Sequence, residues 1–294
     1  MARWAGLVVS MLAWCAVAGC SKPSAPAAAA ADRPALVCHV GGTMLPLIEA
    51  LAEAYRQDTG EAIELNTGDS GSLLALIETQ RHGDLYVCHD PFMDTLMARG
   101  LGVEAWTVAE LTPVIAVAKG NPKGIRGLPD LARPGVEVFL TDYEFSTLGH
   151  LLPTLFSNAG IDFAALNRDK TIHTHRSGSQ AANVVAMGNA DAAIVWNAVA
   201  ALRADRLDQV AITAHLPRPY VDTATSATGK SYRLTPVRVT VATLASSADP
   251  ARAAAFARYL AAPERQAIYE RLGYTVEAAH RRQEYAAGRA VPRP

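Results

Sequence analysis

Strand-like and helix-like segments alternate along the chain, and this order restricts the fold more than any other feature of the sequence. Short apolar runs typical of strands are separated by stretches with helical spacing, such as Met44, Leu47, Leu51 and Tyr55 before Gly60. The order strand–helix–strand–helix–strand needs crossover connections, so it predicts parallel strands with helices on both faces of a sheet. The strand-like runs are 35–40, 63–67 and 85–88, and then 113–118, 136–140, 171–175 and 192–196.

These two series of segments predict two lobes. A further strand-like run at 237–243 and two helical segments follow them. Because one strand and two helices cannot form a domain, we expect them to complete the first lobe. The predicted fold is therefore α/β, with lobes 35–112 plus 237–279 and 113–236, each a mostly parallel sheet flanked by helices, and with two interlobe crossovers. Ligands of open α/β sheets bind at the carboxyl ends of the strands, so we expect a cleft between the lobes that closes by hinge motion.

The two ends of the chain are predicted to lie outside the fold. Residues 1–19 have the form of a signal peptide, in which Arg3 precedes an uncharged apolar run that small residues close. The sequence before and including Cys20 resembles the bacterial lipobox, which implies a lipid on Cys20 and a membrane anchor on the periplasmic side of the cell envelope. The alternative is an ordinary cleaved signal peptide. Residues 20–34 are rich in Ala, Pro and Ser and predict a flexible tether, and 280–294 predict a flexible tail.

The charge balance excludes one class of partner. The chain has 27 Lys and Arg residues against 28 Asp and Glu residues, a formal net charge of −1. A nucleic-acid-binding protein needs a basic surface for the phosphate groups, so we expect no nucleic-acid partner. Composition alone does not separate an enzyme from a binding protein.

Three turns that lead from a predicted strand into a predicted helix carry glycine and hydroxyl residues. The N-terminus of a helix exposes unpaired N–H groups and the positive end of the helix dipole, which suits an anion. Glycine allows close approach of the backbone, and Ser or Thr adds a donor. The alternative is that these residues are ordinary N-caps. The turns are 41–43 with Gly42 and Thr43, 68–72 with Asp69, Ser70 and Gly71, and 176–179 with Arg176 and Ser177.

Three stretches, 68–73, 118–131 and 188–196, together with the order of elements over about 35–277, resemble a known family. It is the molybdate- and tungstate-type periplasmic substrate-binding proteins of ABC transporters. The resemblance implies the two-lobed periplasmic-binding-protein fold of type II, a small oxyanion as ligand, an ABC permease as partner and a monomer. It implies no cofactor and no enzymatic activity. In this family hydroxyl and backbone N–H groups hold the ligand, and by position Thr43, Ser70, the loop 142–147 with Ser146, and Trp196 take this role.

Charged residues at the turns bear on the identity of the ligand. The carboxylate of Asp69 repels an anion unless the anion carries a proton to donate, which phosphate does and fully ionised molybdate does not. Arg176 offers a bidentate grip on an oxyanion, or it is a solvated surface residue. His173 and His175 share one face of a predicted strand and offer metal ligands, although a partly exposed pair is more common.

The chain departs from the family pattern at two Cys-His pairs, Cys38-His39 and Cys88-His89. Their strands are neighbours in the predicted fold, which leaves three interpretations. Cys38 and Cys88 form a disulfide, the four residues bind a transition metal such as zinc, or the thiols are buried beside capping histidines. An enzyme with Cys88 as nucleophile and His89 as base is less favoured, because consecutive strand residues diverge and the sequence has no nucleophile elbow.

Overall fold

The computed structural model describes residues 33–142, 146–169, 173–175, 178–219, 221–225, 231–234, 237–276, 281–283, 285–286 and 289–290. The predicted signal peptide and Cys20 lie outside these residues, as does the predicted tether up to residue 32. Within the described part of the chain, none of the helices has the length and apolar character needed to cross a membrane.

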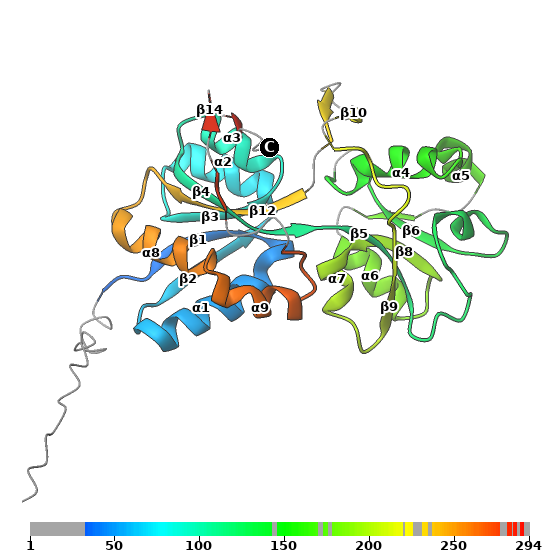
Figure 1. The fold of residues 1–294 in the computed structure, drawn as a ribbon, viewed down its shortest axis with the longest axis horizontal. Coiled ribbons are helices and arrows are strands. Elements are labelled where there is room, and N and C mark those ends of the chain that lie inside the picture. Colours follow the sequence, from blue (N-terminus) through cyan, green and yellow to red (C-terminus); the bar gives the residue numbers. More distant parts are fainter. Residues whose placement is uncertain are drawn as a thin grey trace, which may run out of the picture.

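The first lobe is built on a sheet of six strands with helices on both faces, seen at the left of Figure 1. Strand β1 pairs in parallel with β2 and β3, whereas β12 is antiparallel to both β3 and β4. The sheet is therefore mixed, and the prediction of a mostly parallel sheet is wrong here. Its order is β13-β4-β12-β3-β1-β2, with β1 (Leu36–Gly41), β2 (Ile63–Gly68), β3 (Leu85–His89), β4 (Gly102–Leu111), β12 (Val237–Leu244) and β13 (Arg281–Gln283).

Five helices cover the two faces of this sheet. In Figure 1, α2 and α3 lie on one face and α1, α8 and α9 on the other. The described part of the chain also contains the hairpin strands β10 (Thr223–Thr225) with β11 (Ser231–Arg233), and β14 (Tyr285–Ala286) with β15 (Arg289–Ala290). The helices are α1 (Leu45–Thr59), α2 (Ser70–Gln80), α3 (Phe92–Ala98), α8 (Pro250–Leu260) and α9 (Gln266–Arg271).

The second lobe is built on a five-stranded sheet of the order β7-β6-β8-β5-β9. Strand β6 is parallel to β7 and β8, and β5 is antiparallel to β8 and β9, so this sheet is also mixed. The strands are β5 (Pro113–Ala118), β6 (Val138–Thr141), β7 (His173–His175), β8 (Ala192–Trp196) and β9 (Leu207–Ala211); the helices are α4 (Leu152–Asn158), α5 (Phe163–Asp169), α6 (Gly178–Ala186) and α7 (Asn197–Ala201). Short 3-10 turns occupy Gly42–Met44, Leu128–Ala132, Gly149–Leu151 and Pro263–Arg265.

Helix α1 follows the sequence pattern closely. Pro46 lies in its first turn, where the missing N–H costs no helical hydrogen bond. Leu47, Leu51 and Tyr55 are buried on one face. Gly60 ends the helix with a positive φ of 79°, and its N–H bonds the carbonyl of Arg56.

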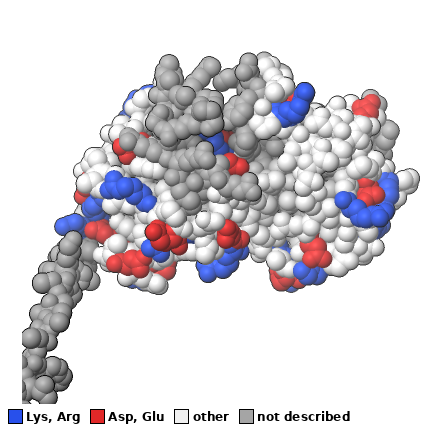
Figure 2. Space-filling model, viewed as in Figure 1, with Lys and Arg blue, Asp and Glu red and all other residues white. Residues whose placement is uncertain are grey.

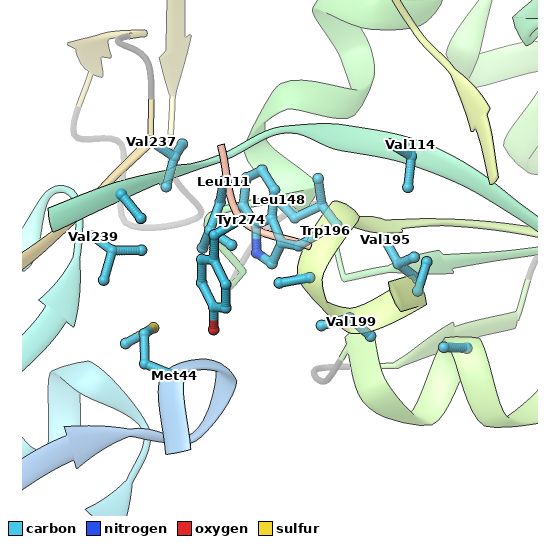
Figure 3. Packing of buried hydrophobic residues seen from close by; sticks show 14 of the residues in the cluster. Met44, Leu111, Val114, Leu148, Val195, Trp196, Val199, Val237, Val239 and Tyr274 are labelled. Carbon is cyan, nitrogen blue, oxygen red and sulfur yellow. The ribbon is translucent and has the colours of Figure 1, made fainter. Parts of the chain in front are cut away.

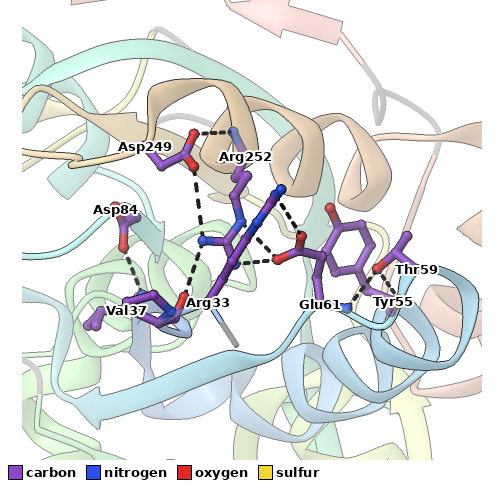
Figure 4. A network of polar contacts seen from close by, with 9 residues as sticks. Arg33, Val37, Tyr55, Thr59, Glu61, Asp84, Asp249 and Arg252 are labelled. Atoms are coloured by element: carbon purple, nitrogen blue, oxygen red, sulfur yellow. Dashed lines mark hydrogen bonds and ion pairs between the residues drawn. The ribbon is translucent and has the colours of Figure 1, made fainter. Parts of the chain in front are cut away.

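The C-terminal part of the chain returns to the first lobe, and polar contacts hold it there (Figure 4). Arg252 in α8 donates through Nε to the carboxylate of Glu61 at 2.8 Å and through Nη1 to the carbonyl of Pro34 at 3.1 Å. Asp249 caps α8 by accepting from the N–H of Arg252. These contacts join α8 to the beginnings of β1 and β2.

The segment predicted to be a flexible tail contributes to the sheet. Strand β13 pairs antiparallel with β4, with Arg281 opposite Thr107. The expectation of a free tail over 280–294 therefore differs from the structure at β13.

On the face drawn in Figure 2, acidic and basic side chains are interspersed along the lower edge.

Candidate functional site

A cleft of about 420 Å³ lies between the lobes, where β1, β2, β3, β6 and β8 end. It contains seven of the residues predicted to bind the ligand: Gly42, Thr43, Asp69, Ser70, Gly71, Ser146 and Trp196. Arg176 and Ser177 lie outside the described residues, but the adjacent Gly178 and Ser179 line the cleft. Gly68 and Thr147, which belong to the predicted turn 68–72 and the predicted loop 142–147, also line the cleft, as does His89, which was predicted as a metal ligand. Four further lining residues were not predicted: Phe92, Thr141, Leu148 and Val199.

Ser70 is held firmly at the first-lobe wall. It is the first residue of α2 and is only 5% exposed. The hydroxyl of the buried Tyr86 donates to its carbonyl at 2.6 Å. A Cβ atom on Gly41 would lie 2.5 Å from Ser70 Oγ, so glycine at the end of β1 is what lets this hydroxyl approach the strand.

Asp69 is the N-cap of α2. Its Oδ1 accepts from the N–H of Ser72 at 2.9 Å, and hydrogen bonding to Ser72 lowers the pKa of the carboxyl below its ordinary value. The side chain is therefore ionised at neutral pH and contributes a negative charge to the cleft. It also satisfies part of the helix end that an anion would otherwise use.

Thr43 and Trp196 lie where the two lobes meet. The hydroxyl of Tyr274 donates to the carbonyl of Thr43 at 2.9 Å and so fixes the turn after β1. Trp196 ends β8 and is only 4% exposed. Figure 3 shows Trp196, Leu148 and Tyr274 grouped at this junction, within one apolar cluster that includes residues of both lobes.

The second lobe contributes hydroxyl groups. Thr141 ends β6 and is 1% exposed, yet its Oγ1 has no hydrogen-bond partner among the described residues. Ser146 Oγ accepts from the N–H of Gly149 at 2.8 Å, which leaves its own proton available for a ligand. In the sequence, Thr141 reads as one more residue of an apolar strand, so no local signal distinguishes it.

The predicted disulfide is wrong. Cys38 and Cys88 are both free and buried. Cys38 is paired with Leu85, three residues before Cys88, so the two lie about 10 Å apart along the strands. They also pack into different apolar clusters, Cys38 with Val40 and Cys88 with Met93. A disulfide needs Cα atoms within about 7 Å, which this register does not allow.

The predicted four-residue metal site is wrong for the same reason. The buried His39 uses both ring nitrogens elsewhere: Nε2 donates to the carbonyl of His82 at 3.0 Å and Nδ1 accepts from Asn66 at 3.0 Å. Of the two Cys-His pairs, only His89 lines the cleft. Among the described residues, no group of three or more His, Cys, Asp or Glu side chains is placed to hold a metal ion.

The thiols are therefore buried core residues. Burial raises the pKa of both Cys38 and Cys88, which keeps them protonated. Cys88 Sγ lies 3.7 Å from Thr240 Oγ1 inside the first lobe, away from the cleft. This placement gives no support to Cys88 as a nucleophile. For His173 and His175 the structure describes only the backbone of β7.

Comparison with known proteins identifies the family and the fold. Residues 36–275 match the model of the bacterial extracellular solute-binding proteins. A Haemophilus influenzae protein described as a binding protein is 26% identical over 161 residues, which span 54% of this chain and 65% of that protein's length.

Solved structures share the fold at low identity. The periplasmic molybdate-binding protein of Azotobacter vinelandii superposes with a TM-score of 0.61 and 20% identity, over 82% of this chain and 99% of the other. The sulfate-binding protein SubI of Mycobacterium tuberculosis superposes with a TM-score of 0.62 and 21% identity, over 82% and 86%. PEB3 of Campylobacter jejuni with bound L-phospholactate gives 0.63 and 17%, over 82% and 100%. The predicted two-lobed α/β fold is confirmed, and the chain belongs to the family of bacterial extracellular solute-binding proteins.

Proposed function

We propose that the protein captures a small oxyanion in the cleft between its lobes and delivers it to an ABC permease for import. The unpaired hydroxyl of Thr141 carries this proposal. A buried polar group without a partner costs about 1–3 kcal/mol, and a ligand oxygen in the cleft would remove that cost. Ser70 on the opposite wall supplies a second buried hydroxyl residue.

The charge of the lining favours recognition by neutral donors. Among the described residues that line the cleft there is no Lys or Arg, and Asp69 is the acidic one. Neutral donors in this lining include the hydroxyls, the indole of Trp196 and the backbone N–H groups at the starts of α2 and α6. Such a site selects an anion by its size and by the number of its hydrogen bonds, and hinge closure would then exclude water.

The solved relatives support the same class of ligand. Two of the proteins with this fold are named for binding molybdate and sulfate, both tetrahedral oxyanions. We extend this class of ligand to the present chain because Ser70 and Thr141 place hydroxyl residues on both walls of its cleft.

Calorimetry with molybdate, tungstate, sulfate and phosphate tests the proposal. We expect at least one of these anions to bind, and Thr141→Val to weaken that binding about tenfold, because the methyl group removes a buried donor and preserves the shape. Thr154→Val, in α4 and away from the cleft, is the matched control and should leave the affinity unchanged. Absence of binding by all four anions, or equal affinity in the wild type and Thr141→Val, would contradict the proposal.

A lipid on Cys20 would hold the monomeric protein at the periplasmic face of a membrane. We expect Cys20→Ala to move the protein from the membrane fraction to the soluble fraction, because the thiol is the only attachment point that the lipobox offers. Fractionation of cells followed by immunoblotting measures this. A Cys20→Ala protein that stays in the membrane fraction after its signal peptide is cleaved would contradict the anchor.

A further inference from the structure

We infer that the ligand donates a hydrogen bond to His89, so that the preferred substrate is an oxyanion that keeps a proton at neutral pH, of which inorganic phosphate is the simplest. Fully ionised oxyanions such as sulfate or molybdate would be disfavoured. This inference rests on the proposed function and names the chemical class of its ligand.

The ring of His89 leaves one nitrogen for a ligand. His89 ends β3 and lines the cleft, and its Nδ1 lies 2.9 Å from the carbonyl oxygen of Asp90. A carbonyl oxygen only accepts, so Nδ1 carries the hydrogen. Nε2 has no hydrogen-bond partner among the described residues, and it is not one of their fully buried unpaired atoms. It is therefore open to the cleft.

The surroundings keep this imidazole neutral. Burial lowers the pKa of His89 below its ordinary value of 6.5. The adjacent Asp90 is engaged by Arg238, whose Nε and Nη2 donate to its two carboxylate oxygens at 2.6 and 2.8 Å, and Asp94 lies 3.6 Å from the same guanidinium. A neutral ring with hydrogen on Nδ1 presents a lone pair at Nε2, so His89 is an acceptor.

The described lining thus contains two side chains that can only accept, His89 through Nε2 and Asp69 through its ionised carboxylate, beside hydroxyls that both donate and accept. A fully ionised oxyanion has only acceptor oxygens. The lone pair of His89 Nε2 would then face a negative oxygen with no hydrogen between them. An oxyanion with one proton can donate to Nε2 while its other oxygens accept from Ser70 and Thr141. Sulfate and monohydrogen phosphate have the same shape and charge at about pH 8 and differ by this one proton, so they form a matched pair.

The experiment measures phosphate and sulfate binding to the wild type by calorimetry at about pH 8. We expect phosphate to bind about 30-fold more tightly than sulfate, because a site with an unmatched buried acceptor rejects the analogue that lacks the donor. In His89→Phe, which keeps a planar ring and removes both nitrogens, the preference should fall below about fivefold. His89→Gln supplies an amide that both donates and accepts, and it should lose the preference while still binding. Thr141→Val should weaken both anions equally and keep the ratio.

The outcomes separate this inference from the proposed function. Equal binding of the two anions by the wild type, or an unchanged ratio in both His89 variants, overturns the inference and leaves oxyanion capture intact. Tight sulfate binding with uptake of one proton, measured in buffers of different ionisation enthalpy, also overturns it, because His89 would then be the donor. Binding of none of molybdate, tungstate, sulfate and phosphate overturns the proposed function and the inference together, whereas binding of molybdate or tungstate without phosphate overturns the inference alone.

Discussion

Replacing Arg238 with methionine is expected to lower the free energy of unfolding by about 3–5 kcal/mol, because it leaves a buried carboxylate without its counter-charge. The Asp90 side chain is 5% exposed and that of Arg238 is 16% exposed. The guanidinium makes two hydrogen bonds to Asp90, and the backbone N–H of Arg238 donates a third at 3.0 Å. Urea denaturation measures the loss.

Two further variants show whether the uncompensated charge is the cause. Asp90→Asn combined with Arg238→Met removes both charges and should recover most of the stability, because a neutral amide can still accept from the backbone of Arg238. Arg56→Met breaks an exposed pair with Glu53 on α1, where the side chains are 56% and 50% exposed, and should lower the free energy of unfolding far less than Arg238→Met does, because water screens this pair. A loss for Arg238→Met as small as that for Arg56→Met would show that water reaches Asp90.

A helix whose ends are marked by characteristic residues can be predicted from the sequence more reliably than a strand whose ends are not marked. Helix α1 has helical spacing and a glycine stop, and both appear in the structure. Strand β4 was not predicted, because 102–111 includes Glu104 and Glu110 and is not bounded by a clear pattern on both sides. It is stabilised by antiparallel pairing with β12, more than 120 residues later in the chain. The same distant strand makes the sheet mixed, which local patterns do not reveal.

The candidate site was predictable where it depends on topology and not where it depends on register. The turns at Thr43 and Ser70 meet in one cleft because parallel strands end at the same edge of a sheet. The prediction that the two Cys-His pairs lie together is wrong because it depends on how β1 and β3 are aligned, which the sequence does not reveal. The observed alignment places Cys38 beside Leu85 instead of Cys88. Thr141 was missed because only its burial without a partner distinguishes it from any other strand threonine.

Replacing Gly273 with alanine is expected to lower the free energy of unfolding by about 3 kcal/mol, because two separate costs act at this position. Gly273 follows α9 with a φ of +82°, a conformation that alanine adopts at a cost of about 1–2 kcal/mol. Its Cβ would also lie 2.3 Å from Cβ of Ala201 in α7, which belongs to the other lobe. Neither of these atoms is on a flexible side chain. The overlap can therefore be removed only if the backbones of α7 and of the segment after α9 move apart.

Gly120→Ala separates the conformational cost from the contact between the lobes. Gly120 has a φ of +80°, nearly that of Gly273, but a Cβ there would meet no atom within 4 Å. It should therefore cost only about 1–2 kcal/mol in the same denaturation experiment. The difference between the two variants measures the contact at Gly273. That contact adjoins Thr275, which pairs with Glu110 in β4 and accepts from Asn197 in α7 at 3.3 Å. If both variants lower the free energy of unfolding equally, α7 and the segment after α9 can separate without a measurable cost. The lobes would then be only loosely held at this junction.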